Sequence, residues 1–114
     1  MINTKALEAD IVVVRNDADR LTATNAKSFR DQVVALVEGG SSRVVIDLST
    51  TQFVDSSGLG ALVGILKRIG HRGELVVCGL NKEIEKLFAI CRMDQVFHLA
   101  GDESAAVERL KNQL

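Results

Sequence analysis

The chain has 114 residues, of which 46% are hydrophobic and 25% are charged, and its formal net charge is -1. This length and composition are typical of one globular domain, which we expect to span residues 1–114, and exclude a disordered or fibrous chain. Fourteen basic residues balance fifteen acidic ones, with no Trp, no Tyr and four Phe. Because nucleic-acid binding needs a basic surface and aromatic stacking, this composition argues against it.

The first predicted elements are two strands and a helix. We expect a short edge strand around Lys5–Glu8, then a buried strand at the β-branched run Ile11–Val14. A helical period begins at Thr24 and ends at Gly39-Gly40. Its apolar face contains Ala26, Phe29, Val33, Val34, Leu36 and Val37.

A second strand and a second helix are predicted in the middle of the chain. The strand is the apolar run Arg43–Leu48, and the polar connection Ser49–Gln52 follows it. The helix begins at Asp55 and Ser56, because side-chain oxygens of Asp and Ser accept the first unpaired N–H groups of a helix. Its apolar face contains Leu59, Leu62, Val63, Leu66 and Ile69, and Gly70 and Gly73 bracket its end.

The last four predicted elements again alternate between strand and helix. Glu74–Cys78 is a buried strand, and Asn81 caps a helix whose inner stripe is Ile84, Leu87, Phe88 and Cys91. Val96–Leu99 is a short strand, and Asp102 opens a helix with Ala106, Val107, Leu110 and Leu114 on one side. This alternation predicts an α/β fold, a mixed β-sheet of four to five strands with about four α-helices packed against it.

The cysteines and the N-terminus indicate where the protein acts. Cys78 and Cys91 each lie in an apolar stretch, where cysteine commonly packs as a small hydrophobe, and we expect a reduced cytoplasmic setting. The first ten residues lack the charged-then-apolar pattern of a signal peptide, and no apolar run is long enough to span a membrane. We therefore expect no membrane insertion.

The most unusual segment is residues 53–64, which combine an acid, two serines and three glycines at the start of an apolar helix. Glycine inside a helix costs up to about 1 kcal/mol relative to alanine, so three glycines require a reason. Gly60 and Gly64 are four residues apart and share a helix face, where a strand or a partner backbone could approach closely. Packing within the molecule is the alternative reading of these glycines.

Three kinds of chemistry are disfavoured by the surrounding residues. The glycines resemble a loosened dinucleotide fingerprint, but a polar connection separates them from the strand, and no phosphate-loop lysine is present. A serine nucleophile would need a histidine base, and His71 lies about 20 Å along the helix from Ser56. No zinc-like paired spacing joins His71, Cys78, Cys91 and His98. We therefore predict a protein that is not an enzyme, with no metal and no cofactor of its own.

Modification of a serine is the remaining chemistry. A serine beside an acid at a helix start is accessible, and a phosphate there would meet free N–H groups and the positive end of the helix. Phosphorylation would also place about -1.5 to -2 charge beside Asp55, which could change a docking surface without refolding the domain. The simpler interpretation is that Asp55 and Ser56 only cap the helix.

Lys67, Arg68 and Arg72 cluster near the end of the same helix. Cations suit the negative end of a helix, so we interpret them as a solvated face, with an anion site as the alternative.

These residues together resemble the single-domain STAS proteins, specifically anti-sigma factor antagonists of bacterial partner-switching systems. The run RVVIDLSTTQFVDSSGLGALVGILKRI is similar to the family's buried strand, connection and Asp-Ser-x-Gly-Leu-Gly helix start. The run GELVVCGLNKEIEKLFAICRMDQVF resembles the strand, helix and strand that follow in the family. The resemblance covers nearly the whole chain.

The resemblance implies a mechanism of regulation. Family members are phosphorylated on the serine directly after the aspartate, which corresponds to Ser56 here, with Ser57 as the alternative. The kinase is a separate GHKL-type serine kinase that uses ATP and Mg²⁺ and also serves as the anti-sigma factor, and a PP2C-type phosphatase reverses the reaction. The unphosphorylated antagonist binds the kinase and frees its client. The implied partner-binding residues are Thr22, Asp55, Ser56, Ser57, Gly58, Leu59 and Gly60.

The sequence departs from the family at Thr22, where many members carry an aspartate before the first helix. Asp19 could replace that charge, although we expect its side chain to face water. The competing function is a STAS subunit that is never phosphorylated and docks constitutively in a transporter or signalling complex. Direct nucleotide binding or hydrolysis is a third hypothesis. We expect a monomer.

Overall fold

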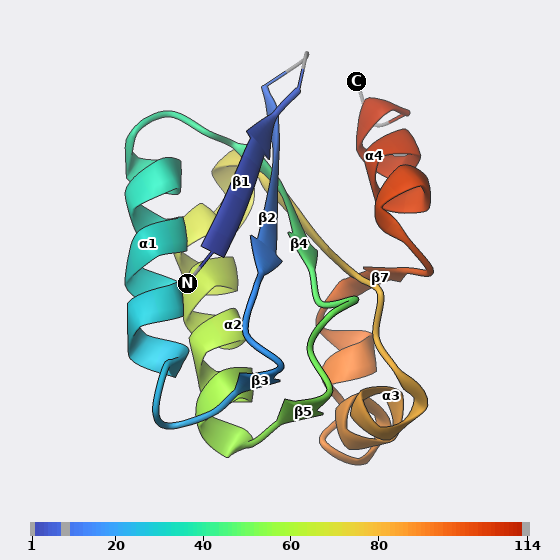
Figure 1. Ribbon diagram of the computed structural model, residues 1–114. Coiled ribbons are helices and arrows are strands. Elements are labelled where there is room, and N and C mark those ends of the chain that lie inside the picture. Colours follow the sequence, from blue (N-terminus) through green and yellow to red (C-terminus); the bar gives the residue numbers. More distant parts are fainter. Residues whose placement is uncertain (1, 8–9, 113–114) are drawn as a thin grey trace.

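The computed structural model describes residues 2–7 and 10–112. Figure 1 shows a central sheet with helices on both faces, and its strand order is β1-β2-β4-β6-β7. The edge strand β1 runs antiparallel to β2, whereas β2, β4, β6 and β7 are mutually parallel. These five strands are β1 (Ile2–Ala6), β2 (Ile11–Asn16), β4 (Arg43–Asp47), β6 (Glu74–Cys78) and β7 (His98–Ala100). The predicted α/β fold with a mixed sheet is confirmed.

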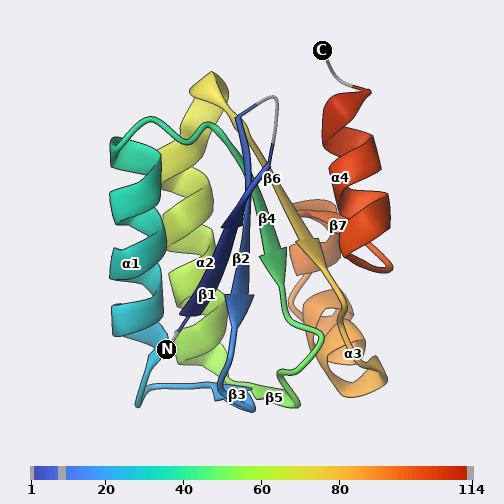
Figure 2. The ribbon, with the colours of Figure 1, turned by 45° about the horizontal axis from the view of Figure 1, so that its top comes forward.

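Four helices surround the sheet in the part of the chain that is described. They are α1 (Ala26–Glu38), α2 (Ser56–Ile69), α3 (Lys82–Ile90) and α4 (Glu103–Lys111). Figures 1 and 2 show α1 and α2 side by side on one face and α4 on the other, with α3 near one end of the sheet. A second, two-stranded sheet of β3 (Arg20–Leu21) and β5 (Phe53–Val54) lies near the start of α2.

Alternation along the strands creates a core on each face of the sheet, because successive side chains point to opposite sides. On one face, alternate strand residues pack against α1, α2 and α3; they include Val12, Val14, Val44, Ile46, Leu75 and Val77. On the other face a smaller cluster packs against α4; it contains Ile11, Val13, Val45, Val76 and Cys78, with Ala106 and Leu110 from the helix.

The predicted helix caps are confirmed in detail. Side-chain oxygens of Asp55, Asn81 and Asp102 accept the N–H three residues further on, at 3.0, 2.8 and 2.8 Å. Each cap satisfies one of the first helical donors, which have no acceptor inside the helix. The starts of α2, α3 and α4 are therefore determined by local chemistry that the sequence displays.

Strand boundaries differ from the predictions to varying extents. Glu74–Cys78 is a strand, as predicted, and the strand predicted over Arg43–Leu48 stops at Asp47. The last strand begins at His98 rather than Val96, because residues 93–95 form a 3-10 turn first. The first strand lies earlier than predicted, at Ile2–Ala6. Glu8 of the predicted first strand and Leu114 of the predicted last helix fall outside the described residues.

The two cysteines have opposite environments. Cys78 is fully buried, and burial raises the pKa of its thiol to about 12, with the Asp47 carboxylate acting in the same direction. Its reactive thiolate form is thereby suppressed. Cys91 is exposed, so its predicted place in the inner stripe of α3 is wrong. The helix ends at Ile90, and the chain turns before Cys91 can follow the buried face.

Candidate functional site

The short sheet of β3 and β5 holds the start of α2 against the segment that precedes α1. Its strands are parallel, with Leu21 opposite Val54. The Leu21 carbonyl accepts the Asp55 N–H at 3.3 Å, and a Cβ added to Gly58 would lie only 2.3 Å from the same oxygen. Gly58 is therefore the glycine of this motif that permits close approach of another backbone.

Asp55 joins two segments that are far apart in the sequence. Its Oδ1 accepts the Gly58 N–H at 3.0 Å and caps α2, while its Oδ2 accepts the Ala23 N–H at 3.3 Å. Both carboxylate oxygens are thus engaged, and the side chain is half-buried. The carboxylate is held at a fixed position beside the first residues of the helix.

Ser56 and Ser57 are exposed in the first turn of α2. The N–H groups of Gly58 and Leu59 are bonded to Asp55. Among the residues that the structure describes, the N–H groups of Ser56 and Ser57 have no acceptor. Two accessible hydroxyls therefore stand at the positive end of a helix, with unused donors beside them.

The other predicted site residues on α2, Gly58, Leu59 and Gly60, expose less side-chain surface than the two serines. Gly58 and Leu59 are buried, whereas Gly60 is exposed and a Cβ there would meet open space. No strand of the described chain approaches Gly60 closely, so that part of the expectation is wrong, and the approach of a partner backbone stays a prediction. Gly64, predicted to share that role, faces the Arg30 side chain of α1, which a Cβ would meet at 3.0 Å.

Thr22 is 8% exposed and forms the turn that begins α1. Its N–H donates to Asn25 Oδ1 at 2.9 Å, and its carbonyl accepts from the Asn25 and Ala26 N–H groups. The side chain of nearby Asp19 is 74% exposed, 3.8 Å from Arg20, so it faces water as expected. Asp55 brings Thr22 and the start of α2 together through the neighbouring Ala23 N–H.

Sequence reasoning missed an apolar groove beside this site. Phe53 and Ile90 are 52% and 79% exposed, and with Leu87 they line a groove of about 310 Å³ between β5 and α3. The Arg20 guanidinium lies 5.9 Å from the centre of the Phe53 ring. Phe53 lies within the unusual segment, but nothing in its spacing distinguishes an exposed apolar side chain from a core residue.

Neither histidine is placed to act on Ser56. His71 follows α2 at the opposite end from Ser56, about 20 Å away along the 14-residue helix. His98 lies 2.8 Å from Arg109 and 3.5 Å from Glu74, on the edge strand β7. Among residues 2–7 and 10–112, no three His, Cys, Asp or Glu side chains are grouped to hold a metal ion.

The fold and these contacts define a small α/β domain whose distinctive surface is an Asp-capped helix start with two exposed serines. The chain belongs to the STAS domain family, whose model matches residues 4–106. Within the described residues, none of the helices combines the length and apolar character needed to cross a membrane.

Known proteins are similar to this chain in sequence and in fold. The chain is 32% identical over 93 residues to the anti-sigma-B factor antagonist of Listeria monocytogenes, covering 81% of this chain and 79% of that protein. A STAS domain protein from Planctomyces limnophilus has a TM-score of 0.86 at 23% identity, covering 96% and 97% of the two chains. Phosphorylated SpoIIAA of Bacillus has a TM-score of 0.72 at 18% identity, covering 96% and 98%. These two structures show a shared fold.

Proposed function

We propose that this protein is an anti-sigma factor antagonist controlled by phosphorylation of Ser56. The unphosphorylated form binds a GHKL-type serine kinase that is also the anti-sigma factor, and thereby frees the kinase's other client. Phosphorylation ends this binding, and a PP2C-type phosphatase restores it. ATP and Mg²⁺ belong to the kinase reaction. The observation that carries the proposal is the exposed Ser56 next to the fixed carboxylate of Asp55, in a chain related to anti-sigma factor antagonists.

Charge explains how phosphate at this position acts as a switch. Asp55 is held by both of its oxygens, so it cannot easily rotate away from a phosphate on Ser56. The positive end of the helix and the free N–H groups stabilise a phosphate on Ser56. The domain therefore stays folded when it is phosphorylated. A docked partner, however, would have to cover about 2.5 to 3 negative charges in place of one.

The proposed kinase-binding surface comprises Thr22 and residues 55–60. Ser56, Ser57 and Gly60 supply its exposed part, while the buried Gly58 and Leu59 shape the helix start beneath them. The exposed Phe53 and Ile90 beside it support a protein-binding function, because large exposed apolar side chains that lie together are typical of protein interfaces.

Phosphate transfer can be tested directly. The purified protein is incubated with ATP, Mg²⁺ and a candidate GHKL-type kinase from the same genome, and its intact mass is measured. We expect one added phosphate, located on Ser56 by peptide fragmentation and removed by a PP2C-type phosphatase. Ser56→Ala should abolish incorporation, whereas Ser57→Ala should retain it.

The controls separate the two proposed functions. Unchanged incorporation in Ser56→Ala would reject Ser56 as the acceptor. If a kinase that is active on another substrate adds no phosphate at all, the result favours the competing function, a constitutive docking subunit of a transporter or signalling complex.

A further inference from the structure

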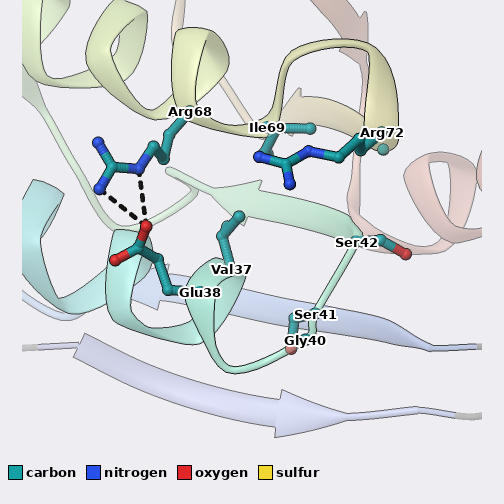
Figure 3. A pocket seen from close by; sticks show the side chains of 9 residues that line it. Val37, Glu38, Gly40, Ser41, Ser42, Arg68, Ile69 and Arg72 are labelled. Carbon is teal, nitrogen blue, oxygen red and sulfur yellow. Dashed lines mark hydrogen bonds and ion pairs between the residues drawn. The ribbon is translucent and has the colours of Figure 1, made fainter.

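A cavity of about 510 Å³ lies at the end of α2 opposite Ser56. Figure 3 shows it between the last turns of α1 and α2 and the connection that leads into β4. Because α2 has 14 residues, this cavity is about 20 Å from the serines at its start. It belongs neither to the proposed kinase-binding surface nor to the groove at Phe53.

The cavity wall carries more positive than negative charge. Arg68 and Arg72 line it from the α2 side, and Glu38 is the acidic residue among the described lining residues. Glu38 Oε2 accepts from Arg68 Nε and Nη2 at 2.9 and 2.8 Å. Figure 3 shows the Arg68 guanidinium turned toward Glu38, with Val37 between it and the Arg72 guanidinium. The lining thus holds two guanidinium groups and one carboxylate, and the carboxylate is bound to Arg68.

Arg72 is the unused donor of this group. Within the described part of the chain its guanidinium has no hydrogen bond or ion pair, unlike that of Arg68. Arg72 also lies beyond Ile69, in the 3-10 turn Gly70–Arg72. Attraction to the negative end of α2 explains the position of Arg68, which lies in the last helical turn. It explains the position of Arg72 less well, because Arg72 lies beyond the helix.

The other lining residues indicate what the uncharged part of a ligand would be. Val37 and Ile69 provide an apolar surface. Ser41 and Ser42 are half-buried, and in the described residues their hydroxyl groups have no hydrogen-bond partner. A cavity of several hundred cubic ångströms with an apolar wall and a few polar groups suits a small organic molecule.

We propose that this cavity binds a small phosphomonoester, with the phosphate between Arg68 and Arg72 and the organic group on Val37 and Ile69. Glu38 already takes Arg68 Nε and Nη2, so the donors left for a ligand are those of Arg72 and Nη1 of Arg68. A phosphate can accept from both guanidinium groups together, because its oxygens are arranged tetrahedrally and each is a strong acceptor. A carboxylate would duplicate the pairing that Glu38 already makes with Arg68.

The test is a titration of the full-length, isotope-labelled protein with phenyl phosphate, followed by amide resonances in NMR. We expect saturable shifts in residues 37–42 and 68–73, with weaker binding of inorganic phosphate and of benzoate. Arg72→Gln should weaken phenyl phosphate binding about tenfold, since a hydrogen bond to a charged group is lost. The NMR spectrum of the Arg72→Gln protein without ligand shows whether this variant remains folded.

Lys67→Gln is the matched control, because Lys67 is exposed on the last turn of α2 and does not line the cavity. It removes the same charge and should leave the affinity unchanged. Equal weakening by both substitutions, shifts that do not saturate, or shifts centred on residues 55–60 would overturn the site. Benzoate binding as tightly as phenyl phosphate would overturn the assignment to a phosphomonoester. No kinase enters this experiment, so its outcome is independent of the proposed switch.

Discussion

Phosphorylation of Ser56 is expected to weaken binding to the GHKL-type kinase by about 3 kcal/mol, or roughly a hundredfold. The cause is a dianion beside the fixed Asp55 carboxylate at a surface that the partner must cover. Ser56→Asp should show a smaller loss, because a carboxylate carries less charge than phosphate. Calorimetric titration of the kinase with the unmodified, phosphorylated and Ser56→Asp proteins measures these differences.

Ser104→Asp provides a matched control for added charge. Ser104 is also exposed in the first turn of an Asp-capped helix, α4, which covers the opposite face of the sheet (Figure 2). Its substitution should leave the affinity for the kinase unchanged. If Ser56→Asp and Ser104→Asp lowered the affinity for the kinase equally, net charge would be the cause. Full affinity of the phosphorylated protein would contradict the proposed switch.

Gly58→Ala is expected to lower the free energy of unfolding by about 3 kcal/mol, which is large for a single methyl group. The new Cβ would lie 2.3 Å from the Leu21 carbonyl oxygen and 2.8 Å from Val54 Cγ1. Relieving this overlap must move the β3–β5 pair, which also holds the Asp55 N–H. Urea denaturation of the purified variant gives the change in stability.

Gly60→Ala separates this steric effect from helix propensity. It adds the same methyl group two residues later in the same helix, where no atom lies within 4 Å. Alanine is the better helix former, so we expect stability to rise by up to about 1 kcal/mol. Similar destabilisation by the two substitutions would show that the Leu21 contact does not determine the cost at Gly58.

Residues with local chemistry were the most predictable parts of the fold and the site. Asp55, Asn81 and Asp102 were recognised as caps because an acceptor side chain precedes an apolar helical period. Glu74–Cys78 was predicted to the residue, since it is a short β-branched run between a glycine turn and a cap. The position of Ser56 at the start of α2 followed from the same reasoning.

Contacts between distant segments were not predictable from one sequence. The strands β3 and β5 have two residues each, too few to show a period, and their pairing depends on where the whole sheet places them. The close approach at Gly58 depends on the Leu21 carbonyl from that pairing, which no residue pattern encodes.

Exposure of apolar residues was a further source of error. Cys91 continues the apolar stripe of Ile84, Leu87 and Phe88, but the helix ends at Ile90 and the Cys91 side chain is exposed. Hydrophobic periodicity identifies which residues can face a core. It does not show where a helix ends relative to that core. Nor does it show that Ile90, which lies off the apolar stripe, joins Phe53 in an exposed groove.

The most direct test of the proposed function is release of the client. A preformed complex of the GHKL-type kinase with its client is titrated with the unphosphorylated protein, and the free client is measured by size-exclusion chromatography. We expect stoichiometric release by the unphosphorylated form and none by the form phosphorylated on Ser56. Failure of the unphosphorylated protein to release the client, or equal release by both forms, would contradict a phosphorylation-controlled antagonist.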